Sequence, residues 1–124
     1  MPSRILLVDD DPDVSYLLQL LLEQTGRYEV KLQTQAREAL ATVTAFRPDL
    51  VLLDVTMPIK NGYEIANEIA AEPSLGNPVV VFLTGLDVEE EKKKRPGSHF
   101  LGKPFRTAEL VSAVDGFLAG RATA

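Results

Sequence analysis

The chain has 124 residues, of which 45% are hydrophobic and 25% are charged, with a net charge of −5 and no cysteine. This composition is typical of one globular domain, and no apolar run approaches the roughly 20 residues that a membrane-spanning helix needs, so we expect no membrane partner. The absence of cysteine excludes disulfides, thiol catalysis and cysteine-based zinc sites and is compatible with a cytoplasmic protein, and the acidic balance argues against direct nucleic-acid binding.

Five segments of strand length alternate with helical segments along the chain. Three of them are continuous apolar runs, as in parallel strands that are covered on both faces. The second segment alternates more and suits a strand nearer the sheet edge, and the fifth is short. The predicted strands are residues 5–8, 28–33, 50–53, 79–83 and 99–101.

Apolar stripes at helical spacing lie between these strands and end at recognisable stop signals. The first helix is expected to begin at Pro12 and to end at Gly26, and the next two to stop before Pro48 and Pro73. Thr107 is the expected N-cap of the last helix. Alternating strands and helices predict an α/β fold with a doubly wound, five-stranded parallel sheet, formed by residues 1–120 and followed by a tail or linker at 121–124.

Polar side chains stand where the predicted strands end. Asp9 and Asp10 follow the first strand, Asp54 follows the third and Thr84 follows the fourth. Ligands of doubly wound sheets bind at the carboxyl ends of the strands, so these side chains are expected to converge there. Neighbouring carboxylates repel one another unless one takes up a proton or a cation, and Mg²⁺ prefers oxygen ligands of this kind. The sequence therefore predicts a site for Mg²⁺ and phosphate.

Asp54 is the best candidate nucleophile of this cluster. A carboxylate can attack phosphorus to give an acyl phosphate, and such a transfer needs charge neutralisation and positioning more than acid–base catalysis. A metal on Asp9, Asp10 and Asp54 would supply part of the positive charge, and Lys103 would supply the rest. The hydroxyl of Thr84 could donate a hydrogen bond to another phosphoryl oxygen.

Each of these motifs also has an ordinary structural reading. The acids around Asp10 could simply favour a helix start, and Asp54 could cap a loop. Thr84 with the following glycine could form a turn, and Lys103 with the following proline could lie in a surface loop. The functional interpretation depends on all four occurring in this order at strand ends.

With these residues in place, the chain resembles a response-regulator receiver domain of two-component signalling, of the chemotaxis-regulator type. The resemblance covers essentially the whole chain. It implies a flavodoxin-like sheet with strand order 2-1-3-4-5. The matching motifs are Val8-Asp9-Asp10-Asp11-Pro12, Asp54-Val55-Thr56-Met57-Pro58 with Asn61-Gly62, Thr84-Gly85 and Lys103-Pro104-Phe105.

The resemblance implies a role for each acidic residue. Asp54 matches the phosphoacceptor, and Asp10 matches the principal Mg²⁺ ligand, with Asp9 acting mostly through water. The backbone carbonyl of Thr56 matches a further metal ligand. The phosphoryl donor would be a phosphohistidine of a histidine kinase or of a histidine phosphotransfer domain.

The resemblance also implies how the state of Asp54 is transmitted. Thr84 matches the switch hydroxyl, and Lys103 matches the lysine that contacts phosphate. Phe100 matches the aromatic switch that turns inward when Thr84 moves, although an aromatic residue on a short edge strand could equally be core packing. His99 beside it is expected to be a solvated strand residue. The bond before Pro104 is usually cis in this family.

The chain departs from the family pattern at residues 86–97, where receiver domains place a fourth amphipathic helix. This segment is about one turn shorter than usual, and no apolar residue follows Val88 until Phe100. Pairs of Glu89–Glu91 with the basic residues four positions later would support a helix by only roughly 0.2–0.5 kcal/mol each. We therefore expect a short or poorly formed, mobile segment, with output through another surface or an unusual homodimer formed on phosphorylation.

Three functions are compatible with this sequence. The first is a phosphorylation-dependent switch that catalyses only its own phosphorylation and dephosphorylation and passes the signal to a downstream effector. The second is a binding module that keeps the fold but does not use phosphate. The third, a Mg²⁺-dependent phosphatase with an aspartyl nucleophile, would carry a second acid where Thr56 stands. The complete acidic set with Thr84 and Lys103 favours the switch.

Overall fold

A five-stranded parallel sheet with strand order β2-β1-β3-β4-β5 forms the centre of the molecule, which confirms the predicted fold class. The computed structural model describes residues 2–103 and 106–123. All five residues of β3 are buried, because both faces of this strand are covered and its side chains are almost entirely apolar. The strands are β1 Ser3–Val8, β2 Tyr28–Gln33, β3 Leu50–Asp54, β4 Val79–Thr84 and β5 His99–Gly102.

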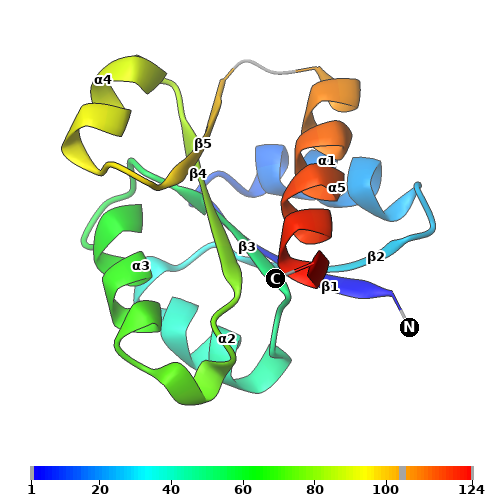
Figure 1. Ribbon diagram of the computed structural model, residues 1–124, viewed down its shortest axis with the longest axis horizontal. Coiled ribbons are helices and arrows are strands. Elements are labelled where there is room, and N and C mark those ends of the chain that lie inside the picture. Colours follow the sequence, from blue (N-terminus) through cyan, green and yellow to red (C-terminus); the bar gives the residue numbers. More distant parts are fainter. Residues whose placement is uncertain (1, 104–105, 124) are drawn as a thin grey trace.

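Helices cover both faces of this sheet (Figure 1). Leu18 and Leu22 of α1 and Leu110 and Val114 of α5 pack on one face. Helices α2 and α3 pack on the other face through residues such as Val43, and α4 lies on the same side (Figure 1). The helices are α1 Pro12–Glu23, α2 Ala39–Phe46, α3 Gly62–Ala70, α4 Val88–Lys94 and α5 Thr107–Thr123, with 3₁₀ turns η1 at Ala36–Glu38 and η2 at Pro73–Leu75.

Local sequence signals fix where these helices begin. The Asp11 side chain accepts hydrogen bonds from the backbone N–H groups of Asp13 and Val14, so α1 starts immediately after the acidic pair. Asn61 and Glu64 form a reciprocal capping box at the start of α3. The first turns of α1 and α3 are therefore held beside the ends of β1 and β3.

The last helix begins differently from the prediction. The expected N-cap, Thr107, is already the first residue of α5, because the carbonyl of Arg106 accepts the first helical hydrogen bond, from the N–H of Leu110. The helix continues to Thr123, so its backbone runs through most of the segment expected to be a tail. Within residues 2–103 and 106–123, no helix is long and apolar enough to cross a membrane.

The fourth helix is short, as predicted, but it is formed. It spans seven residues, and the Asp87 side chain caps it by accepting from the N–H groups of Glu89 and Glu90. The predicted ion pairs at a spacing of four are wrong; Glu89, Glu90 and Glu91 instead pair with Lys92, Lys93 and Lys94 at a spacing of three. The expected partner of Glu91 at a spacing of four, Arg95, has left the helix and stacks on aromatic rings.

Candidate functional site

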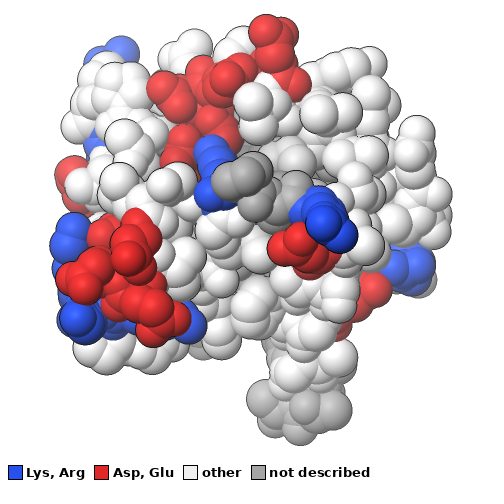
Figure 2. Space-filling model, turned by 90° about the horizontal axis from the view of Figure 1, so that it is seen from above, with Lys and Arg blue, Asp and Glu red and all other residues white. Residues whose placement is uncertain are grey.

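The three predicted acids converge at the carboxyl edge of the sheet. Val8 pairs with Leu53, so the residues that follow them, Asp9 and Asp54, are brought side by side. Asp9 is 1% exposed and Asp54 is 7% exposed, whereas Asp10 is exposed to solvent. One carboxylate oxygen from each acid lies within 4.8 Å of the other two. Figure 2 shows acidic side chains gathered on this side of the molecule, with a basic side chain beside them.

The ionised form of the Asp54 carboxyl group is disfavoured by this arrangement. Burial, followed by the charge of the neighbouring Asp9, raises the pKa of Asp54 to about 6, and the opposing Lys103 lowers it by less than Asp9 raises it. One oxygen, Oδ1, accepts a 3.2 Å hydrogen bond from the backbone N–H of Thr56. Asp54 is therefore oriented by the backbone while its charged form remains incompletely compensated.

Asp9 is held more firmly than Asp54. Its Oδ1 accepts a 3.0 Å hydrogen bond from the N–H of Asp11, and its Oδ2 lies 3.3 Å from Lys103 Nζ. Its backbone carbonyl also accepts from the Ser15 hydroxyl of α1. These contacts fix a buried carboxylate at the centre of the cluster, as a metal-ligand role requires.

Lys103 lies between the two buried acids. Its Nζ is 3.3 Å from Asp9 Oδ2 and 3.8 Å from Asp54 Oδ2. Its backbone N–H donates to the carbonyl of Thr84 at 2.6 Å, which ties the end of β5 to the end of β4. The Lys103 side chain is 29% exposed, so its ammonium group is accessible to a phosphoryl group attached to Asp54.

Thr84 ends β4 and is almost completely buried. Its Oγ1 accepts a 2.9 Å hydrogen bond from the N–H of Leu86. Because a hydroxyl has one proton to donate in addition to its lone pairs, the Thr84 O–H can still donate to a group that arrives at Asp54. Thr56, by contrast, lies two residues after Asp54 with an exposed side chain. The predicted metal-ligand role of Thr56 concerns its backbone carbonyl and does not depend on this side chain.

Two backbone features lie between Asp54 and the first turn of α3; Gly62 was named from the sequence only as part of a motif, and Ile59 was not singled out. A Cβ atom on Gly62 would come within 2.5 Å of the backbone oxygen of Asp54, so only glycine lets α3 start this close to the site. Ile59 has φ +74° and is 78% exposed. A left-handed conformation is strained for a β-branched residue, and neither apolar periodicity nor composition signals it.

Phe100 belongs to an aromatic cluster on the side of the sheet covered by α3 and α4. Its ring centroid is 5.3 Å from Phe82 and 6.3 Å from Tyr63, and Tyr63 meets Phe82 edge-on at 4.8 Å. The side chain of Phe100 is only half-buried in this arrangement. The neighbouring His99 is exposed, as predicted, and its ring lies 4.5 Å from Phe117.

Two charged residues of the polar segment join this cluster, and the sequence reasoning missed both. Glu91 is 3% exposed and accepts a 2.8 Å hydrogen bond from the Tyr63 hydroxyl. The Arg95 guanidinium lies over the rings of Tyr63 and Phe82, 5.6 and 5.3 Å from their centroids. A signal for this inward face was present in the sequence, because the spacing of Val88, Glu91 and Arg95 is that of one face of a helix.

The acidic cluster fits a hard divalent cation. Three carboxylate oxygens lie within 4.8 Å of one another, and hard cations such as Mg²⁺ take oxygen ligands and keep several waters. The exposed Asp10 leaves the cluster open on its solvent side, where water and phosphate could complete the shell. The predicted cis bond before Pro104 lies outside the described residues.

Comparisons with known proteins agree with this geometry. The family model for the response regulator receiver domain matches residues 5–115. The chain is 35% identical to Protein Rrf1 of Nitratidesulfovibrio vulgaris over 120 residues, covering 96% of this chain and 85% of that protein. It is 30% identical to Protein PilH of Pseudomonas aeruginosa over 121 residues, covering 95% and 99%. With Response regulator Rre1 of Synechocystis the match is 35% identical, but the chain spans only 52% of that protein.

Solved structures share the fold over nearly the whole chain. The chemotaxis response regulator CheY4 of Vibrio cholerae superposes with a TM-score of 0.84 at 28% identity, covering 94% of this chain and 99% of that one. For a response regulator from Chloroflexus aurantiacus the TM-score is 0.85 at 32% identity, with coverage of 96% and 99%. The sequence match, the sheet order and the acidic cluster at the strand ends agree, and the chain belongs to the response regulator receiver domain family of two-component signalling.

Proposed function

We propose that this receiver domain accepts a phosphoryl group on Asp54 from a phosphohistidine of a histidine kinase or a histidine phosphotransfer domain in the cytoplasm. The observation that carries the proposal is the cluster itself. Three carboxylates meet at one strand edge, and Lys103 Nζ lies within 4 Å of the two buried ones. Two buried, mutually repelling acids beside one exposed acid form an arrangement that a bound cation would stabilise.

Asp9, Asp10, Asp54 and the backbone carbonyl of Thr56 are the groups that would hold Mg²⁺. The bound ion would neutralise charge on the phosphoryl oxygens and lower the repulsion among the acids. The firm hydrogen bonds to Asp9 keep one ligand in place, and the exposure of Asp10 leaves the entry path open. The proposed nucleophile is thereby kept in its charged form.

In the transfer, a carboxylate oxygen of Asp54 attacks phosphorus and forms the O–P bond. The N–P bond to the donor imidazole breaks at the same centre, and the imidazole leaves with the electron pair and takes up a proton. Lys103 would neutralise a phosphoryl oxygen as a point charge. The Thr84 hydroxyl would donate to a second oxygen, since only its lone pair is used by Leu86.

The same contact would begin the conformational switch. Movement of the Thr84 hydroxyl toward the phosphoryl group loosens its bond to Leu86 at the start of the β4–α4 loop. Thr84 also pairs with Gly102 in the sheet, and two residues earlier Phe82 pairs with Phe100. A shift at the end of β4 would therefore be transmitted to the aromatic cluster. The phosphoryl group would bias the populations of the shifted and unshifted conformations, because it interacts more favourably with the shifted one.

Exposed apolar side chains around the strand ends support docking of a partner protein. Val14 on the first turn of α1, Ile59 in the β3–α3 loop and Leu86 in the β4–α4 loop are 38%, 78% and 53% exposed. All three follow the carboxyl end of a strand, as the acids do. A phosphohistidine must approach Asp54 closely, so the donor protein would cover these side chains during transfer.

Phosphorylation tests the proposal directly. The purified protein is incubated with Mg²⁺ and acetyl phosphate, and the modified residue is mapped by peptide mass spectrometry. We expect one phosphoryl group on Asp54, and no modification without Mg²⁺. Asp54→Asn is the control for the nucleophile. Equal modification of that variant, or an unmodified wild-type protein that also ignores beryllofluoride in its NMR spectrum, contradicts the proposal.

A further inference from the structure

The short α4 leaves part of the sheet uncovered. The helix ends at Lys94, and Pro96 and Gly97, with φ +82° at Gly97, return the chain to β5. Val80 of β4, which faces the side of the sheet covered by α3, is only half-buried, whereas residues 81–84 of the strand are buried. On this face Val80 is flanked by α3 and by the segment that follows α4.

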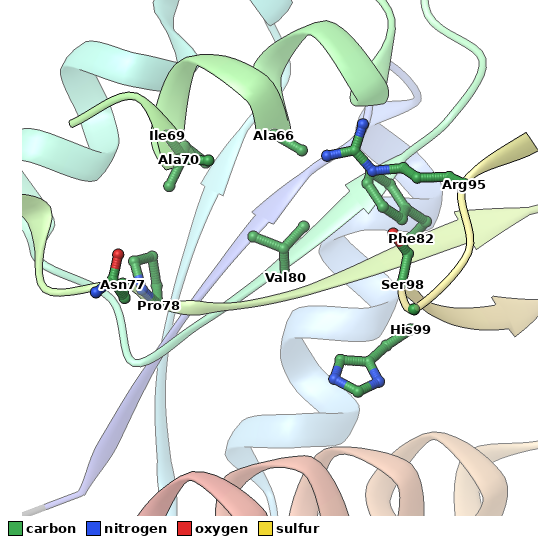
Figure 3. Close-up of a pocket in the computed structure, with 11 residues that line it drawn as sticks. Ala66, Ile69, Ala70, Asn77, Pro78, Val80, Phe82, Arg95, Ser98 and His99 are labelled. Carbon is green, nitrogen blue, oxygen red and sulfur yellow. The ribbon is translucent and has the colours of Figure 1, made fainter. Parts of the chain in front are cut away.

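A pocket of about 240 Å³ occupies this position. Figure 3 shows α3 forming one wall and the end of the α4–β5 segment forming the other, with Val80 between them. The apolar lining comes from α3, from β4 and from the residue just before β4, and comprises Ala66, Ile69, Ala70, Pro78, Val80 and Phe82. The pocket lies near the amino ends of β4 and β5, away from the acidic cluster at their carboxyl ends.

One end of the pocket carries a fixed positive charge. Arg95 lines it, and its guanidinium is held by stacking over Phe82 and Tyr63 and by a 2.9 Å hydrogen bond from NH1 to Asn67 Oδ1. The Asn67 contact uses one of the five N–H groups of the guanidinium. Ser98 and Asn77 supply further polar atoms, whereas the His99 ring points away from the pocket toward α5 (Figure 3). None of the lining residues is acidic. In a chain with net charge −5, this pocket is electrostatically complementary to a carboxylate.

The size of the pocket selects the kind of occupant. Sites for metabolites and drug-sized ligands usually span about 300–1,000 Å³, so this pocket is small for them. A volume of about 240 Å³ suits one large apolar side chain, and single anchors of this kind dominate many protein–protein contacts. The rigid guanidinium adds little ordering cost when it pairs with an acid.

We propose that the pocket between α3, β4 and β5 is a docking site for a partner protein segment in which a large aliphatic side chain is followed by Asp or Glu. The aliphatic side chain fills the space over Val80, and the carboxylate pairs with Arg95. The site is separate from Asp54, and the inference does not depend on phosphorylation. It gives this receiver domain a contact surface at the place where its fourth helix is shortened.

A matched set of blocked hexapeptides tests the site on the ¹⁵N-labelled protein by NMR. The three peptides carry Leu-Glu, Leu-Gln or Ala-Glu between flanking Gly and Ser residues. We expect saturable shifts of the Val80, Arg95 and His99 amides with Leu-Glu at a Kd on the order of 1 mM, as a single anchor gives. Leu-Gln should bind at least about fivefold more weakly, because the charge-assisted pair is lost. Ala-Glu should not bind measurably.

Protein variants locate the contact. Ala70→Trp fills the mouth of the pocket from an exposed position and should abolish binding, whereas Ala71→Trp, one residue further on and outside the lining, should not. Arg95→Gln should make Leu-Glu and Leu-Gln bind equally.

Absence of saturable shifts with the wild-type protein would overturn the proposal without reference to any variant. Equal shifts with isovalerate alone would indicate a free-acid site, and the same shifts on raising the protein concentration would indicate a second copy; either result also overturns it.

Discussion

Burial and the neighbouring Asp9 disfavour the ionised form of Asp54 in the metal-free protein. Its folded-state pKa of about 6 exceeds the ordinary value of 3.8, so the folded protein binds a proton more tightly than the unfolded chain. The folded state is therefore favoured by Asp54 at low pH, and this contribution is lost as the pH rises through about 6. Above that pH, the ionised Asp54 is a net cost to stability.

Asp54→Asn should stabilise the metal-free protein at pH 7–8 because it removes that cost. The rise in the pKa of Asp54 from 3.8 to about 6 corresponds to at most about 3 kcal/mol, so we expect the free energy of unfolding to increase by about 1–3 kcal/mol. The gain should shrink below pH 6 and vanish near pH 4, as measured by urea unfolding across pH. Glu72→Gln, which removes one carboxylate at an exposed position, is the control for the change in net charge. A gain for Asp54→Asn that stays constant from pH 4 to 8 contradicts the assignment.

Ile59 shows backbone strain at the edge of the same site. Its side chain is 78% exposed, so replacing it removes little buried surface, while its φ of +74° is unfavourable for a β-branched residue. Ile59→Gly should raise the free energy of unfolding by about 1 kcal/mol, measured by denaturant unfolding. Ile59→Val keeps the branched side chain and should leave stability nearly unchanged. A destabilised glycine variant would show that the Ile59 side chain makes a contact that outweighs the strain.

At the level of elements, the sequence predicted the strands and their ends well because both depend on local signals. Continuous apolar runs mark the buried strands, and the acids stand immediately after them, so Asp9 and Asp54 converge once the strands are parallel neighbours. The fourth helix was harder to predict because its inward face is polar. Glu91 is buried through a bond to Tyr63, 28 residues earlier in the chain, and no periodicity of apolar residues reports such a partner.

The bond between Tyr63 and Glu91 should hold α4 against α3. Burial, followed by the Glu91 hydrogen bond, raises the pKa of Tyr63 to about 12, so the phenol remains a donor throughout the ordinary pH range. Tyr63→Phe keeps the ring contacts and removes only the hydroxyl. Amide exchange across residues 89–95 should become about three- to tenfold faster, because a buried carboxylate loses one partner. Tyr16→Phe, at an exposed tyrosine on α1, is the control. Unchanged exchange in Tyr63→Phe would show that the pairing with Lys94 alone fixes the helix.

On the scale of the whole molecule, strands β4 and β5 connect the proposed phosphorylation site to the aromatic cluster of Tyr63, Phe82 and Phe100. Thr84 and Gly102 are paired at the end of β4 and β5, and Phe82 and Phe100 are paired two residues earlier. Phe82 also contacts Tyr63 and Arg95, which reach α3, α4 and the pocket. A two-state shift at Thr84 would therefore change contacts on the face that the short helix leaves open, and coupling of this kind is reciprocal for binding.

Thr84→Ala should separate phosphorylation from this response. Asp54 and Lys103 remain in place, so beryllofluoride should still bind, with affinity reduced about three- to tenfold by the lost hydrogen bond. The NMR shifts that beryllofluoride causes at Tyr63, Arg95 and Phe100 in the wild-type protein should be largely absent. Thr84→Ser keeps the hydroxyl and should restore them, which distinguishes a lost hydrogen bond from a packing defect at a site that is 1% exposed. If Thr84→Ala transmits the full set of shifts, the signal leaves Asp54 by another route, through the β3–α3 loop and Gly62, and the β4–β5 path carries none of it.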